Sequence, residues 1–546
     1  MFQILLVCLI GNFPLIGNLP AAAADAGWSA WAADEPDGKM RLGINFAGPA
    51  DWNTELPFCD VFKLSRPWLS QRHGAGWGQG PELELDPRGF IKRLQPGCFA
   101  ETPLCTIEGG HYPSGRYTVW YRGRGKIEFS GAATTRSTTP SPSPSTSTST
   151  STSTTPPTSR GMGKIEIDVD AKRGGFFMRL METDPDDLIR DLHVILPGYE
   201  DRWKESIWRD EFLEAWKGMS VFRAMDWQHT NNSEIESVDD FPELTDATYT
   251  PHGLPIELIC DFANRTGIDP WFCVPHRAND AAVRHMAKTI HTKLDPERKV
   301  LVEYSNEVWN AQFKQAKFAQ AKGQALGLAE KPWEAGWKFT SKRSLEIFEI
   351  FDDVFAQAGK DFENRRVIRV LPAQAANAFV AQQIVAAFDA AQHADVLAIA
   401  PYVSMNVRPE QAESVITLGV DGILEKARRE SLPKAIDWIR KNHQVAQAKG
   451  LRLYAYEAGQ HLVGVGDAVH NEALTKLLQA ANRSPQMGIL YDDYFAAWEA
   501  AGGELMCLFS STGRYSKWGS WGLREYADQD ESDAPKFRST MRWLRK

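Results

Sequence analysis

The segment KVLVEYSNE (residues 299–307) joins an apolar run to an abrupt polar end. Its branched and aromatic side chains are typical of a buried strand, which the pattern predicts to end near Ser305. Asn306 and Glu307 then stand where the strand meets its loop. A glutamate at such an edge is often an ordinary solvated residue, so the segment gains meaning only from a partner elsewhere in the chain.

Further segments have the same apolar character, and helical stretches such as NDAAVRHMAKTIHTKL and LPKAIDWIRKNHQVAQAKG lie between them. They are RLGINFAG (41–48), SVFRAMDW (220–227), DPWFCVPH (269–276), RVIRVLPAQ (366–374), DVLAIAPYV (395–403), LRLYAYEAG (451–459) and GELMCLFSS (503–511). Strands that alternate with helices in this way predict an α/β fold, a (β/α)8 TIM barrel with a buried parallel sheet. A doubly wound open sheet is the alternative, but no Gly-x-Gly-x-x-Gly motif or P-loop follows a strand.

A second kind of strand pattern lies between the first two barrel segments. Its members alternate apolar and polar residues: RYTVWYR (116–122), GKIEFSG (125–131), GKIEIDVD (163–170), GFFMRLM (175–181) and IRDLHVIL (189–196). Such alternation indicates strands with one buried face, so we expect a small antiparallel β domain inserted after the first barrel strand. A Ser/Thr/Pro tract (134–160) interrupts it, and we expect this tract to be a disordered loop between two strands.

These patterns divide the chain into four predicted parts: a signal peptide (1–24), the first barrel strand region (25–50), an inserted β-rich domain (51–199) and the remaining barrel (200–546). The first part has a short apolar run followed by small residues, although no Lys or Arg precedes the run. Glycine and proline interrupt the run, which makes a membrane-spanning helix the poorer alternative. We expect a secreted protein, extracellular or periplasmic, with no membrane contact after cleavage.

Composition narrows the choice of partner. The chain has 546 residues and a formal charge of −9, which argues against nucleic acid as a partner, because phosphate binding needs clustered Lys and Arg.

Of the cysteines beyond the leader, Cys98 and Cys105 are the nearest candidates for a disulfide. Cys273 and Cys507 lie in apolar runs, where buried free thiols are at least as common. No Cys-x-x-Cys pair indicates a zinc site.

Polar residues at the predicted strand ends form the candidate site, because a (β/α)8 barrel carries its active site at the carboxyl ends of its strands. These residues are Asn45, Arg223, Asp226, His276, Asn306, Glu307, Gln374, Tyr402, Glu457 and Ser510. The two glutamates follow the fourth and seventh strands, so barrel closure makes them face each other. Two facing carboxyl groups are what glycoside hydrolysis needs, one as acid/base and one as nucleophile or general base.

Asn-Glu after the fourth strand and a lone glutamate after the seventh resemble the signature of the clan-A glycoside hydrolases, the retaining (β/α)8 β-glycosidases. The resemblance implies that Glu307 is the acid/base, that Glu457 is the nucleophile and that Asn306 hydrogen-bonds the substrate 2-hydroxyl. It covers the barrel segments. The whole chain also resembles uncharacterised secreted bacterial proteins labelled cellulose-binding.

The same resemblance implies roles for three further strand-end residues. Arg223 would hold the nucleophile ionised, Tyr402 would be its second partner and His276 would bind substrate. Each has an alternative: Arg223 pairs with Asp226, Tyr402 is a packing residue, or His276 caps a helix.

Aromatic and amide side chains supply the remaining candidates for substrate binding. Trp309 follows the Asn-Glu pair and is either a core residue or a platform for a sugar ring. Gln374 and Asn377 follow the fifth strand. The eighth strand lacks the tryptophan usual in this group, but Trp518 and Trp521 follow it closely.

The sequence therefore predicts a secreted, monomeric glycoside hydrolase, without a cofactor or metal, acting on a β-linked polysaccharide or oligosaccharide, most simply a β-glucan such as cellulose. The alternative is a non-catalytic carbohydrate-binding protein on a barrel scaffold. Serine and metal hydrolases find no support, because the Gly-x-Ser-x-Gly and His-Glu-x-x-His motifs are both absent.

Overall fold

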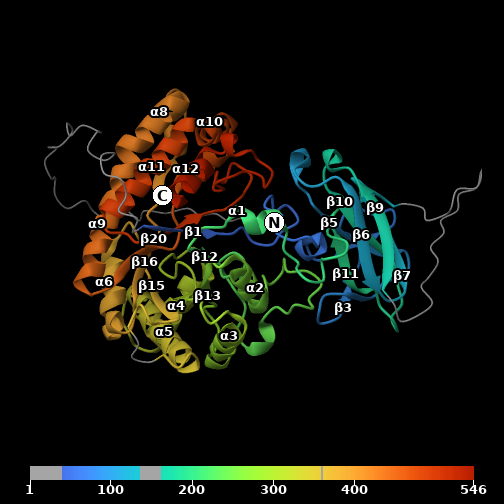
Figure 1. Ribbon diagram of the computed structural model, residues 1–546, viewed down its shortest axis with the longest axis horizontal. Coiled ribbons are helices and arrows are strands. Elements are labelled where there is room, and N and C mark those ends of the chain that lie inside the picture. The colour runs from blue at the N-terminus through green and yellow to red at the C-terminus, as the bar shows by residue number, and fades with distance from the viewer. Residues whose placement is uncertain (1–39, 136–161, 358–360, 546) are drawn as a thin grey trace, which may run out of the picture.

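A closed parallel barrel forms the centre of the computed structural model, which describes residues 40–135, 162–357 and 361–545 (Figure 1). Its order is the order of the chain: β1 (Arg41–Asn45), β12 (Val221–Arg223), β13 (Asp269–Val274), β14 (Val300–Tyr304), β15 (Val367–Pro372), β16 (Val396–Ile399), β18 (Arg452–Ala455) and β20 (Leu505–Phe509). All eight strands lie in the predicted segments, and β1 closes the barrel by pairing with β20. The predicted (β/α)8 fold is confirmed.

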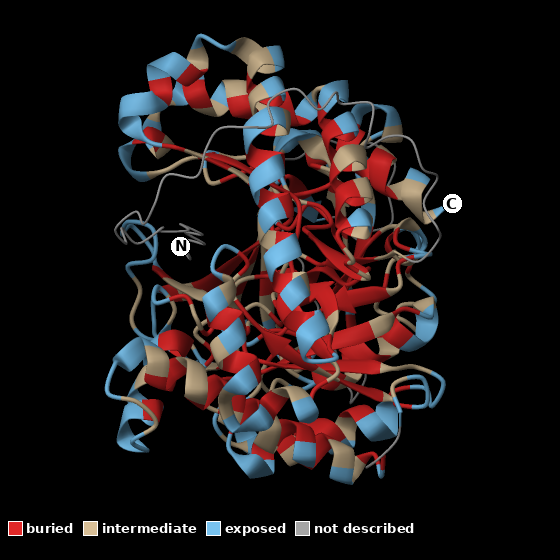
Figure 2. Cartoon of the chain, turned by 90° about the vertical axis from the view of Figure 1, so that its left-hand side faces the viewer, coloured by how far each residue is buried: buried red, intermediate tan, exposed pale blue. Residues whose placement is uncertain are grey.

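Helices surround the barrel and present their exposed faces outward, while the strands inside are buried (Figure 2). They are α1 (Asp210–Ala215), α2 (Ile256–Thr266), α3 (Asp280–Lys293), α4 (Lys314–Ala325), α5 (Pro332–Val354), α6 (Ala378–Ala386), α7 (Ala412–Ile416), α8 (Gly419–Lys426), α9 (Leu432–Ala448), α10 (Glu472–Arg483), α11 (Pro485–Ala500) and α12 (Pro535–Leu544). Local chemistry fixes their starts: the Asn279 side chain, for example, accepts a hydrogen bond from Ala282 N and caps α3. None of these helices is long and apolar enough to cross a bilayer.

The barrel strands send alternate side chains inward and outward, as the period of two requires. On β14, Val302 and Tyr304 pack outward against the helices, whereas Leu301 joins an inner cluster with Trp271 and Tyr456. Glu303 therefore stands on the inner face of a strand whose other members are apolar. This charged residue inside the barrel becomes part of the site described below.

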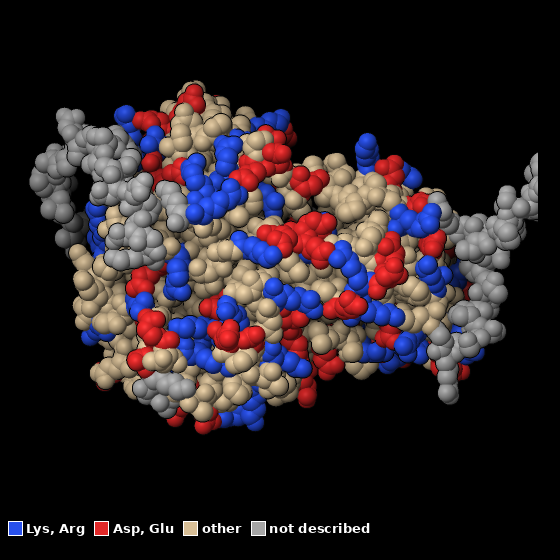
Figure 3. Space-filling view, viewed as in Figure 1, with Lys and Arg blue, Asp and Glu red and all other residues tan. Residues whose placement is uncertain are grey.

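The inserted β region lies to one side of the barrel and contains two four-stranded antiparallel sheets (Figure 1). One sheet has the order β2 (Leu69–Arg72), β5 (Cys98–Leu104), β10 (Phe176–Thr183) and β7 (Gly125–Gly131); the other has β11 (Arg190–Ile195), β6 (Gly115–Arg122), β9 (Gly163–Val169) and β8 (Ala133–Thr135). Buried rings join the two layers, with Tyr117 of one sheet and Phe176 of the other 5.8 Å apart between ring centroids. Basic and acidic side chains are interspersed over the face drawn in Figure 3.

The smaller elements complete this chain order. The short strands are β3 (Glu84–Leu85) and β4 (Ile91–Arg93) in a hairpin, and β17 (Val403–Val407) paired with β19 (Gln460–Gly464) above the barrel. The β17–β19 pair extends the chain immediately beyond two strand ends that carry site residues. It therefore helps to fix the backbone on which those residues stand.

The tract prediction needs one correction. The repeated segments that flank the tract are β7 and β9, and they belong to different sheets. The antiparallel partners of β9 are instead β6 and β8, and in β8 Thr134 and Thr135 are the first residues of the tract. Gly131, with a φ of 79°, ends β7 and lets the chain pass to the other sheet before β8 begins. Residues 136–160, like the predicted signal peptide, lie outside the described residues.

The predicted Cys98–Cys105 disulfide is wrong. Both residues are free and buried, as are Cys273 and Cys507. Cys98 begins β5 and Cys105 follows its last residue. An extended strand rises about 3.3 Å per residue, so the two thiols lie at opposite ends of a strand far longer than a disulfide can span.

Candidate active site

Arg223 is the hub of the site at the carboxyl ends of the barrel strands. It ends β12 and is completely buried. Its Nη1 donates to Glu457 Oε1 at 3.0 Å, and its Nη2 donates to Asn306 Oδ1 at 2.8 Å. Asn45, the last residue of β1, accepts from the same guanidinium at 3.4 Å. Four strand-end residues are thus brought together as barrel closure predicts.

Glu457 stands beyond β18 with a donor on each oxygen. Arg223 occupies Oε1, and the Tyr402 hydroxyl donates to Oε2 at 2.9 Å. Burial raises the pKa of this carboxyl, while the guanidinium and the phenol oppose the rise. The alternative in which Arg223 pairs with Asp226 is not what the structure contains, since its ion pairs go to Glu457 and Glu303.

Glu307 stands beyond β14 in a different environment, because no cation in the described part of the chain forms an ion pair with it. Asn310 Nδ2 donates to its Oε2 at 3.0 Å, and the Tyr456 hydroxyl donates to Oε1 at 3.4 Å. Burial, followed by repulsion from Glu457, raises the pKa of Glu307 to about 8. At neutral pH the geometry therefore favours a protonated Glu307 beside an ionised Glu457.

The backbone carrying Glu307 is held in an uncommon conformation. Ser305 and Glu307 both have positive φ values, 58° and 44°. Residues other than glycine enter this region at a cost of roughly 1–3 kcal/mol and persist there when the surroundings impose it. The strain places the Glu307 carboxyl inside the site, where only 2% of the residue is exposed.

Glu303 is a site residue that the sequence reasoning missed. It receives two hydrogen bonds from Arg223, from Nε at 2.9 Å and from Nη2 at 3.0 Å. Both side chains are fully buried, so each charge depends on the other. The available signal was a lone glutamate inside an apolar strand. Arg223 is consequently shared between two carboxylates, Glu303 and Glu457.

Asn306 is held on both sides of its amide. While its Oδ1 accepts from Arg223, its Nδ2 donates to Asn231 Oδ1 at 3.0 Å. Gln315 then donates both to Asn231 Oδ1 and to the Asn306 carbonyl. Asn231 and Gln315 were not predicted, because they come from a loop and a helix rather than from strand ends. Together they fix the rotamer of Asn306.

Asp226 is a third carboxyl group close to Glu457. Burial and the charge of Glu457 raise its pKa to about 7, with Arg223 opposing. Its exposure to solvent is intermediate, unlike the fully buried glutamates. Asp226 therefore stands on the solvent side of the site.

Aromatic rings form one wall of the site, and Trp521 is the central member. Its ring lies 5.9 Å from Tyr402, 4.8 Å from His461 and 5.8 Å from Phe509, measured between centroids. The Ser510 backbone N–H donates to Trp521 O at 3.2 Å and anchors this segment to the end of β20.

Trp518, the other tryptophan predicted near the eighth strand, lies in the tight turn Ser516–Gly519 and contacts Lys517. Of the two rings, Trp521 is the one that packs on Tyr402. The chain reverses between the two residues, and sequence proximity does not show which ring returns to the barrel. Trp309 on the other side of the site donates from Nε1 to the Tyr456 hydroxyl at 3.3 Å.

Three other predicted residues have no hydrogen bond to the glutamates in the described structure. His276 is buried beside Phe318, and burial lowers its pKa to about 4. Its Nδ1 has no partner among the described residues. Gln374 is half-buried beyond β15, and Asn377 caps α6 by accepting from Phe379 N. Asn377 thus has a structural role at this helix terminus.

The described residues contain no group of three or more His, Cys, Asp and Glu side chains placed to hold a metal ion. The carboxyl groups of the site are instead occupied by Arg, Tyr and Asn donors. What the arrangement offers chemically is a pair of carboxyl groups with unequal protonation, next to an aromatic wall.

Comparison with known proteins gives low similarities. No family model and no curated protein matches the chain. Among solved structures, it is similar to the Clostridium thermocellum endo-1,4-β-D-xylanase 10B modules, with 9% identity, a TM-score of 0.36 and coverage of 90% of this chain and 96% of that one. A Fusarium oxysporum 4-O-α-L-rhamnosyl-β-D-glucuronidase is similar with 11% identity, a TM-score of 0.34 and coverage of 59% of this chain and 61% of that one.

A Cellulomonas fimi endo-β-1,4-mannanase gives 10% identity, a TM-score of 0.33 and coverage of 60% of this chain and 63% of that one. The chain thus spans less than two thirds of the glucuronidase and of the mannanase. Values this low carry no argument about activity. The barrel is established by the strand pairing itself.

Proposed function

We propose that the chain is a retaining glycoside hydrolase that cleaves a β-linked polysaccharide or oligosaccharide. One observation carries the proposal: two buried glutamates at barrel strand ends have opposite surroundings. Glu457 has a guanidinium and a phenol as donors, which favour its ionised form. Glu307 has neutral donors and a pKa raised to about 8, which favours its protonated form. A nucleophile and an acid need this difference at one pH.

The roles follow from that difference. Ionised Glu457 attacks the anomeric carbon as protonated Glu307 gives its proton to the departing glycosidic oxygen, which leaves a glycosyl ester on Glu457. Deprotonated Glu307 then takes a proton from water, and that water's oxygen attacks the same carbon and releases Glu457. Asn306, fixed by Arg223 and Asn231, is placed to hydrogen-bond the sugar beside the ester. Two inversions give net retention.

The substrate class and the cellular location of the protein are more specific proposals. A β-glucan such as cellulose is the proposed substrate class, because Trp521 and Tyr402 offer flat faces suited to pyranose rings beside the glutamates. The proposal that the protein is exported rests on residues 1–24 alone. That the protein is a monomer stays a prediction.

Screening the purified full chain on β-glucan, cellulose, mannan and xylan tests the proposal. We expect reducing ends to be released from at least one substrate, with a loss of at least a thousandfold in Glu457→Gln. Glu499→Gln, which changes a glutamate outside the site on α11, is the matched control and should keep full activity. Saturable binding of a glycan without hydrolysis would favour the carbohydrate-binding alternative.

A further inference from the structure

Asp226, just beyond the end of β12, has a carboxyl group with no hydrogen-bond donor in the described part of the chain. The groups that act on it are the charges of Glu457 and Arg223. The residue is half-buried, and its oxygens are not among the closed-in polar atoms that lack a partner, so they remain open to solvent. Asp226 is therefore an acceptor at the barrel mouth that a bound molecule can reach.

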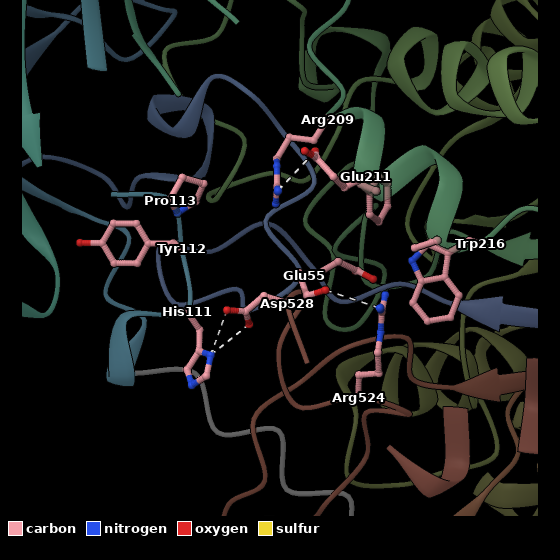
Figure 4. A pocket seen from close by; sticks show the side chains of 12 residues that line it. Glu55, His111, Tyr112, Pro113, Arg209, Glu211, Trp216, Arg524 and Asp528 are labelled. Carbon is pink, nitrogen blue, oxygen red and sulfur yellow. Dashed lines mark hydrogen bonds and ion pairs between the residues drawn. The ribbon is translucent and has the colours of Figure 1, made fainter. Parts of the chain in front are cut away.

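The carboxyl groups around the cavity drawn in Figure 4 are paired, in contrast to that of Asp226. This cavity of about 310 Å³ lies outside the barrel, and none of its lining residues belongs to the strand-end site. Each of its three carboxyl groups has a side-chain partner within 3.3 Å: Glu55 with Ser511, Glu211 with Arg209, and Asp528 with His111. A carboxyl group left without a donor in a half-buried place costs free energy, so its presence at the site calls for donors from the substrate.

The surroundings of Asp226 place it at the edge of the aromatic wall. Met225, the residue before it, packs in one cluster with Tyr402 and Phe509, against which Trp521 also packs. In the loop after β1, a Cβ added to Gly48 would lie 3.6 Å from the Asp226 Cβ. A pyranose ring stacked on an aromatic face directs its hydroxyl groups outward from the edge of the ring. They would point toward the rim on which Asp226 stands.

The glycone is the part of the substrate that lies on this side of the site. In the proposed reaction Glu457 attacks the anomeric carbon of the glycone, whereas Glu307 lies beside the departing oxygen. The charge of Glu457 acts on Asp226, and Glu307 is not among the groups that do so. Asp226 therefore stands on the side of the nucleophile, next to the glycone.

Arg223, the cation of the site, has no donor left for a carboxylate of the substrate. A guanidinium carries five N–H donors. Its Nε donates to Glu303, its Nη1 to Asn45 and Glu457, and its Nη2 to Glu303 and Asn306. The carboxylate of a uronic acid would thus meet the negative groups of the site without a free cation, and like charges at this range repel.

We propose that Asp226 is a specificity residue, which accepts hydrogen bonds from hydroxyl groups of a neutral glycone and excludes a uronic acid from the same place. This inference rests on the proposed function of the barrel site. Burial and the charge of Glu457 raise the pKa of Asp226 to about 7. Hydrogen bonds from sugar hydroxyl groups would stabilise its ionised form, which no side-chain donor of the described chain does.

Rates on two matched substrates test this role: 2,4-dinitrophenyl β-D-glucoside has the neutral glycone and 2,4-dinitrophenyl β-D-glucuronide has the uronic acid. We expect the unmodified full chain to have a kcat/KM at least about a hundredfold higher on the glucoside. Asp226→Ala removes both acceptors and should lower the value on the glucoside about tenfold or more. Asp226→Asn keeps one acceptor and loses the charge. It should lose about threefold to tenfold on the glucoside but gain about tenfold or more on the glucuronide.

Asp421→Asn and Asp421→Ala are the matched controls, because Asp421 is an exposed aspartate on α8. Both rates should stay within about twofold of the unmodified chain. Since Asp226 has no hydrogen-bond donor in the described chain, neither of its variants should lower the free energy of unfolding in urea. A fall in stability with an equal loss on both substrates would give Asp226 a structural role and overturn the proposal.

Deoxy forms of the glucoside identify the hydroxyl group that Asp226 binds. The loss caused by Asp226→Ala should shrink on the 2-, 3-, 4- or 6-deoxy form that lacks this hydroxyl, because the interaction is then already absent. The same loss on all of these forms would contradict the proposed contact.

Failure of the proposed function gives a different result from failure of this inference. An unmodified chain that hydrolyses the glucuronide as fast as the glucoside would overturn the role of Asp226 and leave hydrolysis intact. If the chain hydrolyses neither substrate nor a glycan of the screen, calorimetric titration with cellobiose compares the same variants. Asp226→Ala should then weaken binding about tenfold or more and Asp421→Ala should not. Absence of binding, or an unchanged Kd in Asp226→Ala, would overturn the inference.

Discussion

The Tyr402 hydroxyl donates to Glu457 on the oxygen that Arg223 leaves free, at 2.9 Å. Both residues are buried, so water does not compete for this bond. The two donors together oppose the rise in pKa that burial imposes on Glu457. The ionised form of Glu457 is therefore stabilised by two donors, one charged and one neutral, and mutation can remove each of them separately.

Tyr402→Phe should shift the acidic limb of the pH profile of kcat/KM to higher pH. Without the phenol the pKa of Glu457 rises further, so a smaller fraction is ionised at each pH below neutrality. A hydrogen bond to a charged group contributes roughly 1.5–3 kcal/mol, which corresponds to about a tenfold to hundredfold loss of rate. The pH profile measured on an aryl β-glycoside checks both effects.

Tyr117→Phe is the matched control for this change. Tyr117 is also a buried tyrosine, and its hydroxyl donates to the Pro113 carbonyl in the β region. Its loss should lower stability without moving the acidic limb. An unmoved limb in Tyr402→Phe would show that the phenol does not help to ionise Glu457.

Glu303→Gln should move the same limb in the opposite direction. The charge of Glu303 raises the pKa of Glu457 and occupies Arg223 through two hydrogen bonds. Removing that charge leaves the guanidinium less neutralised beside Glu457, so the pKa of Glu457 falls. The limb should appear at lower pH, while chemical denaturation reports a loss of stability. A shift to higher pH would mean that Glu303 acts mainly by positioning Arg223.

Glu307→Gln should stabilise the fold increasingly as the pH rises. The pKa of Glu307 is about 8 in the folded chain, against roughly 4.3 in an unfolded one. Because folding raises this pKa, the free energy of unfolding is highest at pH values below the pKa of the unfolded chain. That contribution of Glu307 is lost as the pH rises toward 8. Glutamine avoids this loss. The difference in unfolding free energy should grow between pH 4.5 and 8 to the order of a few kcal/mol.

Glu346→Gln provides a control of opposite sign. Hydrogen bonds from Lys342 and Arg343 outweigh burial and lower the pKa of Glu346. The contribution of this carboxyl is present above its unfolded pKa, so the variant should be less stable than the parent at pH 6–8. Urea unfolding of both variants at several pH values separates the cases. A pH-independent effect of Glu307→Gln would contradict the raised pKa.

Trp521→Ala and Trp518→Ala form a matched pair across one turn. Trp521 packs on Tyr402 and His461, whereas Trp518 packs on Lys517 at the surface. We expect Trp521→Ala to raise KM for an oligosaccharide about tenfold, at the upper end of the roughly 0.5–1.5 kcal/mol that an aromatic contact contributes. Trp518→Ala should change KM less than twofold. Equal effects would mean that the aromatic wall does not contact substrate.

Sequence patterns were sufficient to predict the barrel, because each strand is a continuous apolar run bounded by polar ends. They placed Arg223, Glu307, Tyr402 and Glu457 at strand ends on the same rim of the barrel, where closure brings the cluster together. Glu303 was missed for the complementary reason. A single glutamate within VLVEY looks like an interruption until Arg223 lies beside it in space.

Residues that reach the site from loops could not be predicted from strand ends. Asn231 and Gln315 meet only through the path of a loop and the start of a helix. The repeated GKIE sequence led to the wrong prediction that β7 and β9 are paired strands, because strands of similar sequence need not pair. Sequence distance alone also suggested the Cys98–Cys105 bond, which an extended strand forbids.

The last prediction concerns the covalent step assigned to Glu457. Glu457→Ala should abolish turnover of an activated aryl β-glycoside, because no carboxylate remains to form the ester. Added azide fits the space of the lost carboxylate and should restore turnover, giving a glycosyl azide of inverted configuration. Glu307→Ala should keep a fast first step on this substrate, since a good leaving group needs no proton, but the second step should slow. Azide should then give the retained product.

The anomer that the wild-type protein forms first, followed by NMR, decides between two roles of the same glutamates. A retaining pair stands about 5 Å apart, whereas an inverting pair leaves room for water between the carboxyl group and the sugar. Retention is expected here, because Arg223 and Tyr402 stabilise Glu457 as a carboxylate, the form a nucleophile needs. An inverted first product would make Glu457 a general base instead. Full activity in Glu457→Ala would mean that the active site does not lie at the barrel mouth.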